Sequence, residues 1–104
     1  MNNLKAIAEA MGYLRCDMNL SKEDPYLLAS RICNDQGHIE SIKYDPLKND
    51  TQNRQIQEHF KIAISFDENF RLWIAESFDE EIERSGKTIN EAVLNCASEI
   101  VNND

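Results

Sequence analysis

Two histidines and three cysteines are the residues of this chain best suited to metal binding or nucleophilic chemistry. The histidines are His38 and His59, and no cysteine or histidine pair has the short spacing that zinc sites use. Cys33 and His38 flank a predicted turn, so a thiol and a base could approach each other there. Because cysteine is so often simply buried, we expect a core thiol and a solvated histidine instead. We therefore predict no enzyme, no catalytic residue, no metal and no cofactor.

A run of carboxylates interrupted by apolar residues, over residues 76–83, is the stronger candidate for function. Such a run is usually a solvated loop that aids solubility. It can also form an interface, in which the carboxylates steer a Lys/Arg-rich surface and aromatic area supplies affinity. Strict strand alternation turns Trp73 away from the main core, toward a second helical layer or solvent, and of these we favour burial under a helix. Trp73 is nevertheless a candidate for the same interface. The candidate partner-binding residues are Trp73, Glu76, Phe78, Asp79, Glu80, Glu81 and Glu83, with Ile82 as a second apolar anchor.

Charge is the compositional feature that most restricts the partners of the protein. The net charge is −8, and residues 61–104 hold ten Asp/Glu against four Lys/Arg. This balance disfavours direct binding to DNA or RNA and favours a basic protein partner. The 104 residues allow one domain, 1–104. The chain has no apolar run long enough for a membrane span and no signal-peptide pattern, so we expect a cytoplasmic protein.

The first half of the chain predicts a helix followed by strands. Apolar residues at helical spacing over 4–11 precede Gly12, which suits the C-terminal cap of a helix. Residues 21–25 fit a turn or a helix start, and residues 26–33 fit a strand or a helix, of which we favour the strand. The predicted strands are 13–20, 26–33 and 38–44, with a turn over 34–37 joining the last two.

The second half holds the clearest local signals. We expect a mostly polar helix over 50–60, a strand–turn–strand unit over 62–75, a connecting loop over 76–87, and a helix from Ile89 capped by the Thr88–Glu91 box. The fold class is therefore α+β, with helices packed on an antiparallel sheet. The apolar residues expected to share the core face of the hairpin are Ile62, Ile64, Phe66, Phe70, Leu72 and Ile74.

Four short segments carry a family resemblance. They are IAEAMGY at 7–13, YDPLKND at 44–50, WIA at 73–75 and EAVL at 91–94. In these segments the chain resembles the phage ABA-sandwich domain family, small proteins of bacteriophage and prophage genomes. The chain lacks the tryptophan-rich middle of that family, and its helix after Asp50 is more polar. The resemblance implies an α-β sandwich and a phage or prophage origin, and it implies no activity.

Together these observations predict a small acidic accessory protein of phage type that acts by protein–protein binding. The expected partner is a basic protein or nucleoprotein complex of the bacterial host, whose phosphate-binding surface the acidic face would occupy. An anti-CRISPR-like, counter-defence inhibitor is the specific form of this hypothesis. Two alternatives are a structural or regulatory homo-oligomer, paired through a sheet edge or the Trp73 face, and a small hydrolase that uses Cys33 and His38.

Overall fold

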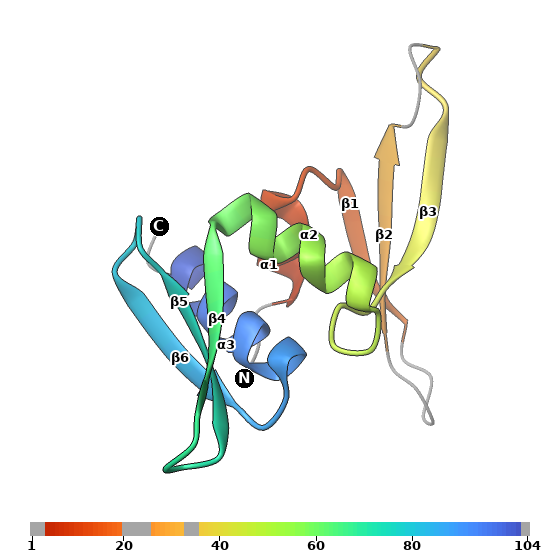
Figure 1. Ribbon diagram of the computed structural model, residues 1–104. Helices are drawn as coiled ribbons and strands as arrows, with labels where there is room; N and C mark the ends of the chain where they lie inside the picture. Colours follow the sequence, from red (N-terminus) through yellow and green to blue (C-terminus); the bar gives the residue numbers. More distant parts are fainter. Residues whose placement is uncertain (1–3, 20–25, 33–35, 103–104) are drawn as a thin grey trace.

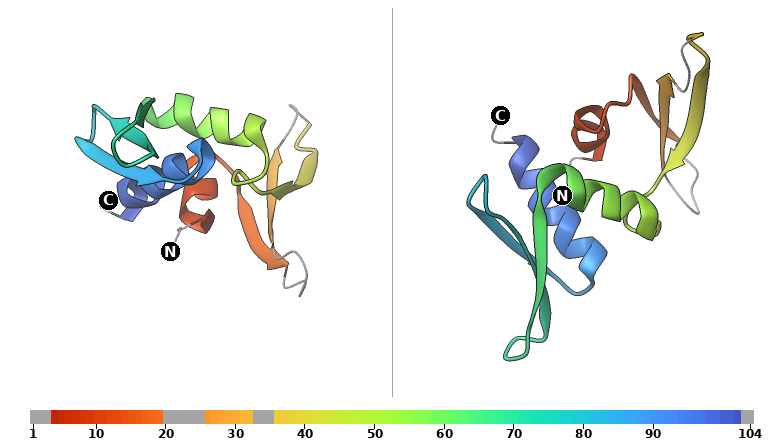
Figure 2. Two further views of the ribbon diagram at one scale, coloured as in Figure 1. Left: turned by 60° about the horizontal axis from the view of Figure 1, so that its bottom comes forward. Right: turned by 45° about the horizontal axis from the view of Figure 1, so that its top comes forward.

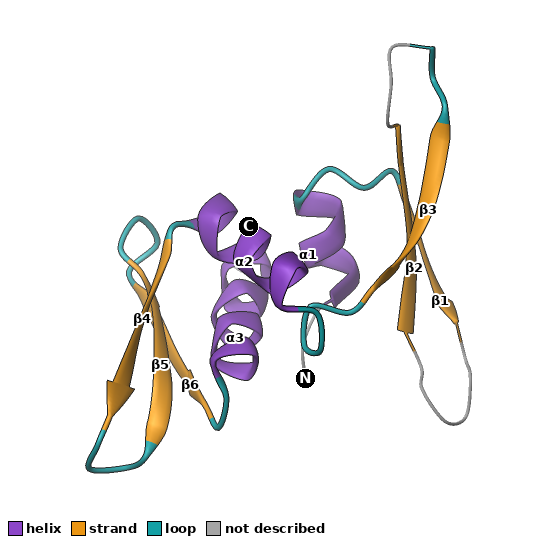
Figure 3. Cartoon of the chain, turned by 45° about the vertical axis from the view of Figure 1, so that its right-hand side comes forward, coloured by secondary structure: helices purple, strands orange, loops and turns teal. Residues whose placement is uncertain are grey.

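The computed structural model describes residues 4–19, 26–32 and 36–102, which form three helices and two three-stranded antiparallel sheets. The elements are α1 (Leu4–Ala10), β1 (Arg15–Asn19), β2 (Tyr26–Ile32), β3 (Ile39–Tyr44), α2 (Asp50–Phe60), β4 (Ile62–Asp67), β5 (Leu72–Ser77), β6 (Ile82–Gly86) and α3 (Ile89–Asn102). The sheets have the orders β1-β2-β3 and β4-β5-β6. The helices lie between the two sheets (Figures 1 and 3). The predicted α+β class, with helices packed on strands, is confirmed, and the strands divide into two sheets.

The first helix ends just before Gly12, which caps it as predicted. Gly12 has a φ of +100°, a left-handed conformation that glycine adopts without strain. Its N–H donates to the carbonyl of Glu9 at 3.0 Å, and the N–H of Tyr13 donates to the carbonyl of Ala8 at 3.1 Å. These two bonds satisfy carbonyls that the end of a helix leaves without partners. The cap therefore directs the chain sharply from α1 into β1.

The first sheet is built from β1, β2 and β3, so the preference for a strand at residues 26–33 is confirmed for Tyr26–Ile32. In this sheet Leu27, Ala29 and Tyr44 are buried in the hydrophobic core. The Tyr13 and Tyr44 rings lie 5.1 Å apart and tilted, a favourable arrangement for aromatic pairs. The predicted turn or helix start at 21–25, and part of the turn at 34–37, lie outside the described residues.

Replacing Tyr44 by phenylalanine is expected to stabilise the protein by about 1–2 kcal/mol. Tyr44 is 1% exposed, and its hydroxyl has no hydrogen-bond partner within the described part of the chain. Burial, with smaller contributions from Tyr13 and Cys16, raises the pKa of Tyr44 above its ordinary 10.0. The neutral phenol is thus favoured in the folded state, and wild-type stability should fall as the pH rises above 10.0.

Urea unfolding of both proteins at neutral and alkaline pH checks this prediction. The Tyr44→Phe variant should lose less stability on the alkaline side, because only Tyr13 then retains a pKa raised by burial in this aromatic pair. Equal alkaline losses in the two proteins, or a less stable variant at neutral pH, would contradict it.

The second helix begins and ends where the sequence predicts, at Asp50 and Phe60. Its N-cap is Asn49, whose side-chain oxygen accepts the N–H of Gln52 at 3.0 Å. The Gln52 side chain is itself buried, accepting the N–H of Asp45 at 2.7 Å and donating to the carbonyl of Lys43 at 2.9 Å. Gln52, which the sequence pattern would place on the surface, thus holds the connection between β3 and α2 in position.

The next residue, Asn53, is fully buried and joins α2 to the start of α3. Its Nδ2 donates to the carbonyls of Pro46 at 3.0 Å and Asn90 at 3.3 Å, and its Oδ1 accepts from Gln57 at 2.9 Å. Asn90 in turn donates to the carboxylate of Asp50 at 2.9 Å. Helical periodicity gave no sign of this buried polar contact, because the only apolar residues on the predicted face were Ile56 and Phe60.

The predicted core face of the β4–β5 hairpin is wrong for β5. Asp67 pairs with Leu72, so the turn contains residues 68–71 instead of 67–69. The Asp67 carboxylate accepts the N–H groups of Asn69 and Phe70, and Arg71 closes the turn at a φ of +54°. A register change of an odd number of residues moves every side chain to the other face of the strand. The helix-facing side chains are therefore Ile62, Ile64 and Phe66 with Trp73, Ala75 and Ser77, and Phe70 lies in the turn.

The last helix is the centre of the core, in contact with α1, α2 and all three strands of the second sheet (Figure 2). The Oγ1 of Thr88 accepts the N–H of Glu91 at 3.1 Å, which confirms the Thr88 half of the predicted capping box. The apolar stripe that predicts this helix consists of Ile89, Ala92, Val93, Cys96, Ala97, Ile100 and Val101. Leu94 and Ser98 are buried in addition to this stripe, since helices pack on the side of α3 away from the sheet. Ile89, expected to be part of that stripe, is 36% exposed.

Candidate protein-binding surface

The acidic run forms the end of β5, a tight turn and β6, so the predicted loop over 76–87 is wrong. The turn contains residues 78–81, and Glu81 adopts a left-handed φ of +55°. The helix-facing positions of β6 are Ile82, Arg84 and Gly86. Only one of them is a large apolar residue, which leaves no alternation by which the strand could have been recognised.

The structure places the predicted carboxylates around one end of this hairpin. Asp79, Glu80 and Glu81 are exposed on the turn, and Phe78 beside them is 66% exposed. Glu76 and Glu83 follow on the two strands. We call this surface the acidic hairpin end; it consists of Glu76, Phe78, Asp79, Glu80, Glu81 and Glu83.

The charges of the acidic hairpin end are poorly compensated. Glu76 and Glu83 are directly opposite each other on β5 and β6, and like charges in that position destabilise a sheet. Among the described residues, one ion pair involves the turn: the Nζ of Lys61 lies 3.3 Å from the carboxylate of Asp79. Both side chains are mostly exposed, so this pair contributes less than about 1 kcal/mol. The surface therefore presents a strong negative potential next to an exposed aromatic ring.

Two residues that were predicted to belong to this surface are not part of it. Ile82 is 9% exposed and belongs to the core, and the thiol of Cys96 lies 3.8 Å from its carbonyl oxygen. Trp73 is at the other end of β5, roughly 14 Å along the strand from Ser77. It faces the helices, half-buried, and its ring contacts that of Phe66 at 5.0 Å. The structure thus separates Trp73 from the acidic hairpin end.

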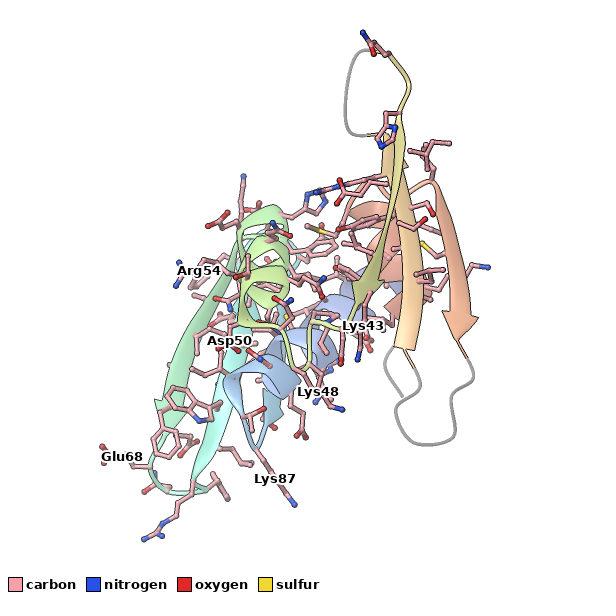
Figure 4. All side chains as sticks on the ribbon, turned by 90° about the vertical axis from the view of Figure 1, so that its right-hand side faces the viewer. Lys43, Lys48, Asp50, Arg54, Glu68 and Lys87 are labelled. Atoms are coloured by element: carbon pink, nitrogen blue, oxygen red, sulfur yellow. The ribbon has the colours of Figure 1, made fainter. Side chains whose placement is uncertain are left out.

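A second surface, which was not predicted from the sequence, lies beside the middle of β4. It is an open groove of about 500 Å³ between α2, β4 and the start of α3. Figure 4 shows Arg54 and Lys87 on either side of Asp50, with Glu68 at the tip of the β4–β5 hairpin. The lining residues are Asp50, Arg54, Gln57, Ile64, Thr88, Ile89 and Asn90.

The thiol and imidazole groups of the described residues differ in their surroundings. Burial raises the pKa of the Cys96 thiol, so the nucleophilic thiolate is disfavoured at neutral pH. His59 is exposed and packs edge-on against Phe60 at 4.8 Å. His38 is also exposed, and Cys33, its proposed partner, lies outside the described residues. Within 4–19, 26–32 and 36–102, no three His, Cys, Asp or Glu residues are grouped closely enough to hold a metal ion.

Comparison of the chain with protein-family profiles, with curated protein sequences and with solved structures gives no match. The resemblance to the phage ABA-sandwich domain family therefore stays a prediction. No helix in the described part of the chain has the length and apolar character needed to cross a membrane.

Proposed function

We propose that this protein acts by binding, through its acidic hairpin end, a basic surface of another protein. The carrying observation is the exposure of Phe78 beside three carboxylates of the same turn. Exposed aromatic rings supply much of the affinity in protein interfaces, and surrounding charges accelerate encounter and select the partner. The acidic hairpin end combines both within a few residues.

The like-charge pair of Glu76 and Glu83 supports the same proposal. Two carboxylates on directly opposed strand positions lower the stability of the isolated protein. A basic partner would neutralise both of them, so the cost in the free protein would be recovered in the complex. Stability alone gives no reason for acidic residues at both positions.

The specific form of the proposal is a phage-type accessory protein in the cytoplasm of a bacterial host. Its partner would be a basic protein or a nucleoprotein complex, blocked at the surface that normally holds phosphates. Anti-CRISPR-like counter-defence is one activity that works in this way. This form rests on the charge of the chain and on the family resemblance.

A pull-down from bacterial lysate with charge-matched bait proteins tests the proposal. The turn variant carries Glu80→Lys and Glu81→Lys, and the control variant carries Glu9→Lys and Glu68→Lys, at two exposed carboxylates away from the acidic hairpin end. Both variants have the same net charge. The turn variant should retain about tenfold less of the basic protein that wild type retains, because two attractive charges become repulsive.

The control variant should retain this protein nearly as well as wild type. Equal losses in the two variants would mean that net charge, rather than the acidic hairpin end, drives the binding. Recovery of no basic protein by wild type, at any salt concentration, would contradict the proposal.

A further inference from the structure

The β4-β5-β6 sheet has an open face opposite the helices. In the described part of the chain, α2 and α3 contact this sheet from one side, and the other side is uncovered (Figure 3). Directly opposed residues of neighbouring strands point to the same side, so the strand register identifies the side chains of this outer face. They form two rows across the strands, Ser65–Ile74–Ser85 and Ala63–Glu76–Glu83.

The row of Ile74 forms the apolar floor of a shallow hollow. Ile74 is half-buried, while its neighbours Ser65 and Ser85 are small and exposed. The hollow has a volume of about 250 Å³ and is lined by Ile74, Glu83, Arg84 and Ser85. An aliphatic side chain laid across it would remove the exposed part of Ile74 from water, which is favourable.

The next row places two carboxylates, those of Glu76 and Glu83, beside this floor. Directly opposed residues of antiparallel strands have Cβ atoms about 4.5–5.5 Å apart, so one cation can contact both carboxylates. Neither carboxylate forms an ion pair within residues 4–19, 26–32 and 36–102. Arg84, which also lines the hollow, pairs with Glu99 of α3 at 3.3 Å and donates to the carbonyl of Glu83. The hollow thus combines an apolar floor with negative charge that the described part of the chain does not neutralise.

We infer that this outer face binds an arginine side chain of the basic partner. The methylene groups of the arginine would lie on Ile74, and its guanidinium would donate to Glu76 and Glu83. Arginine suits this position better than lysine, because a planar guanidinium can bond two carboxylates at once and is less strongly hydrated than an ammonium group. This inference rests on the proposed function and deepens it, since it names the contact by which the strands of the acidic hairpin end recognise their partner.

An NMR titration of the isotope-labelled full chain with short probe peptides tests this inference. The main probe is a capped pentapeptide with one arginine between glycines. Two matched peptides carry lysine or citrulline, which has nearly the shape of arginine without its charge. Because exposed ion pairs are weak, we expect the arginine peptide to bind with a millimolar dissociation constant and to shift the backbone signals of residues 74–76 and 83–85. The lysine peptide should bind several-fold more weakly, and the citrulline peptide should cause no shift.

A double variant, Glu76→Gln with Glu83→Gln, separates a direct contact from a folding defect. It should lose the shifts caused by the arginine peptide. It should also unfold at a higher urea concentration than wild type, because the repulsion between two opposed carboxylates is removed. The control variant, Glu9→Gln with Glu68→Gln, has the same net charge and changes two exposed carboxylates elsewhere, so it should show the same shifts as wild type.

Four results would each overturn the inference. They are shifts confined to the turn at residues 78–81, equal binding of the citrulline or lysine peptide, no shift with the arginine peptide, and wild-type binding by the Glu76→Gln/Glu83→Gln variant. Failure of the proposed function would appear differently, as recovery of no basic protein in the pull-down.

Discussion

Replacing Asn53 by leucine is expected to lower the free energy of unfolding by about 2–4 kcal/mol. Leucine has a similar shape, but it cannot donate to the carbonyls of Pro46 and Asn90, which Asn53 holds at 3.0 and 3.3 Å. A buried carbonyl that loses its donor without reaching water costs roughly 1–3 kcal/mol. The same change also removes the acceptor that Gln57 uses. Thermal unfolding should therefore occur roughly 10–20 °C lower than in wild type.

A matched control is available on the same helix. Gln55 is exposed, so Gln55→Ala should change stability by no more than about 0.5 kcal/mol. If Asn53→Leu proved as stable as wild type, the contact from α2 through Asn53 to the start of α3 would contribute nothing to the fold.

Replacing Gly86 by alanine is expected to lower the free energy of unfolding by about 3 kcal/mol. A Cβ at this position would lie 2.5 Å from the backbone nitrogen of Ala92 and 3.0 Å from its Cα. The first turn of α3 would have to move away from β6, and the core between Val93, Cys96 and the sheet would loosen. This loss of stability would come from the close approach of the β6 and α3 backbones. It would not come from an unusual φ, because Gly86 is part of the β6 strand.

Chemical denaturation of Gly86→Ala beside Ser85→Ala measures this effect. Ser85 is the preceding, exposed residue of the same strand, and its substitution should change stability by less than about 0.5 kcal/mol. Similar stabilities for Gly86→Ala and wild type would mean that α3 does not lie as close to β6 as the structure shows.

The three helices were predictable because their signals are local. The Thr88 hydroxyl and the Gly12 cap each act within a few residues and are found as predicted. The apolar spacing of α3 is found as well, apart from the exposed Ile89. The buried side chains of Gln52 and Asn53 could not be predicted, because their partners lie up to 37 residues away along the chain. In the sequence they resemble any other polar residues of a surface helix.

The second sheet shows how a small error in a turn changes the face of a whole strand. Residues 67–69 and 68–71 are equally plausible turns by composition, but only the second places Trp73 on the side of the helices. β6 escaped prediction because Arg84 and Gly86 occupy helix-facing positions at which apolar residues were expected. Both residues are explained by their contacts with α3: Arg84 pairs with Glu99 at 3.3 Å, and the backbone of Gly86 lies close to that of Ala92.

The candidate site was predicted in part. The exposure of the acidic run and of Phe78 followed from composition alone, since such runs rarely enter a core. The inclusion of Trp73 and Ile82 in the same surface depended on the strand register, which the sequence did not determine. The groove near Ile89 combines α2, β4 and α3, so no single segment of the sequence indicates it.

The affinity of the purified partner for three proteins tests most directly whether the acidic hairpin end binds a basic protein. Titration calorimetry at ~150 mM salt would compare wild type, Glu80→Lys/Glu81→Lys and Glu9→Lys/Glu68→Lys, which differ in where the charges are reversed. We predict a dissociation constant about tenfold or more weaker for the turn variant, and within about twofold of wild type for the control. Equal affinity of wild type and the turn variant would contradict the claim.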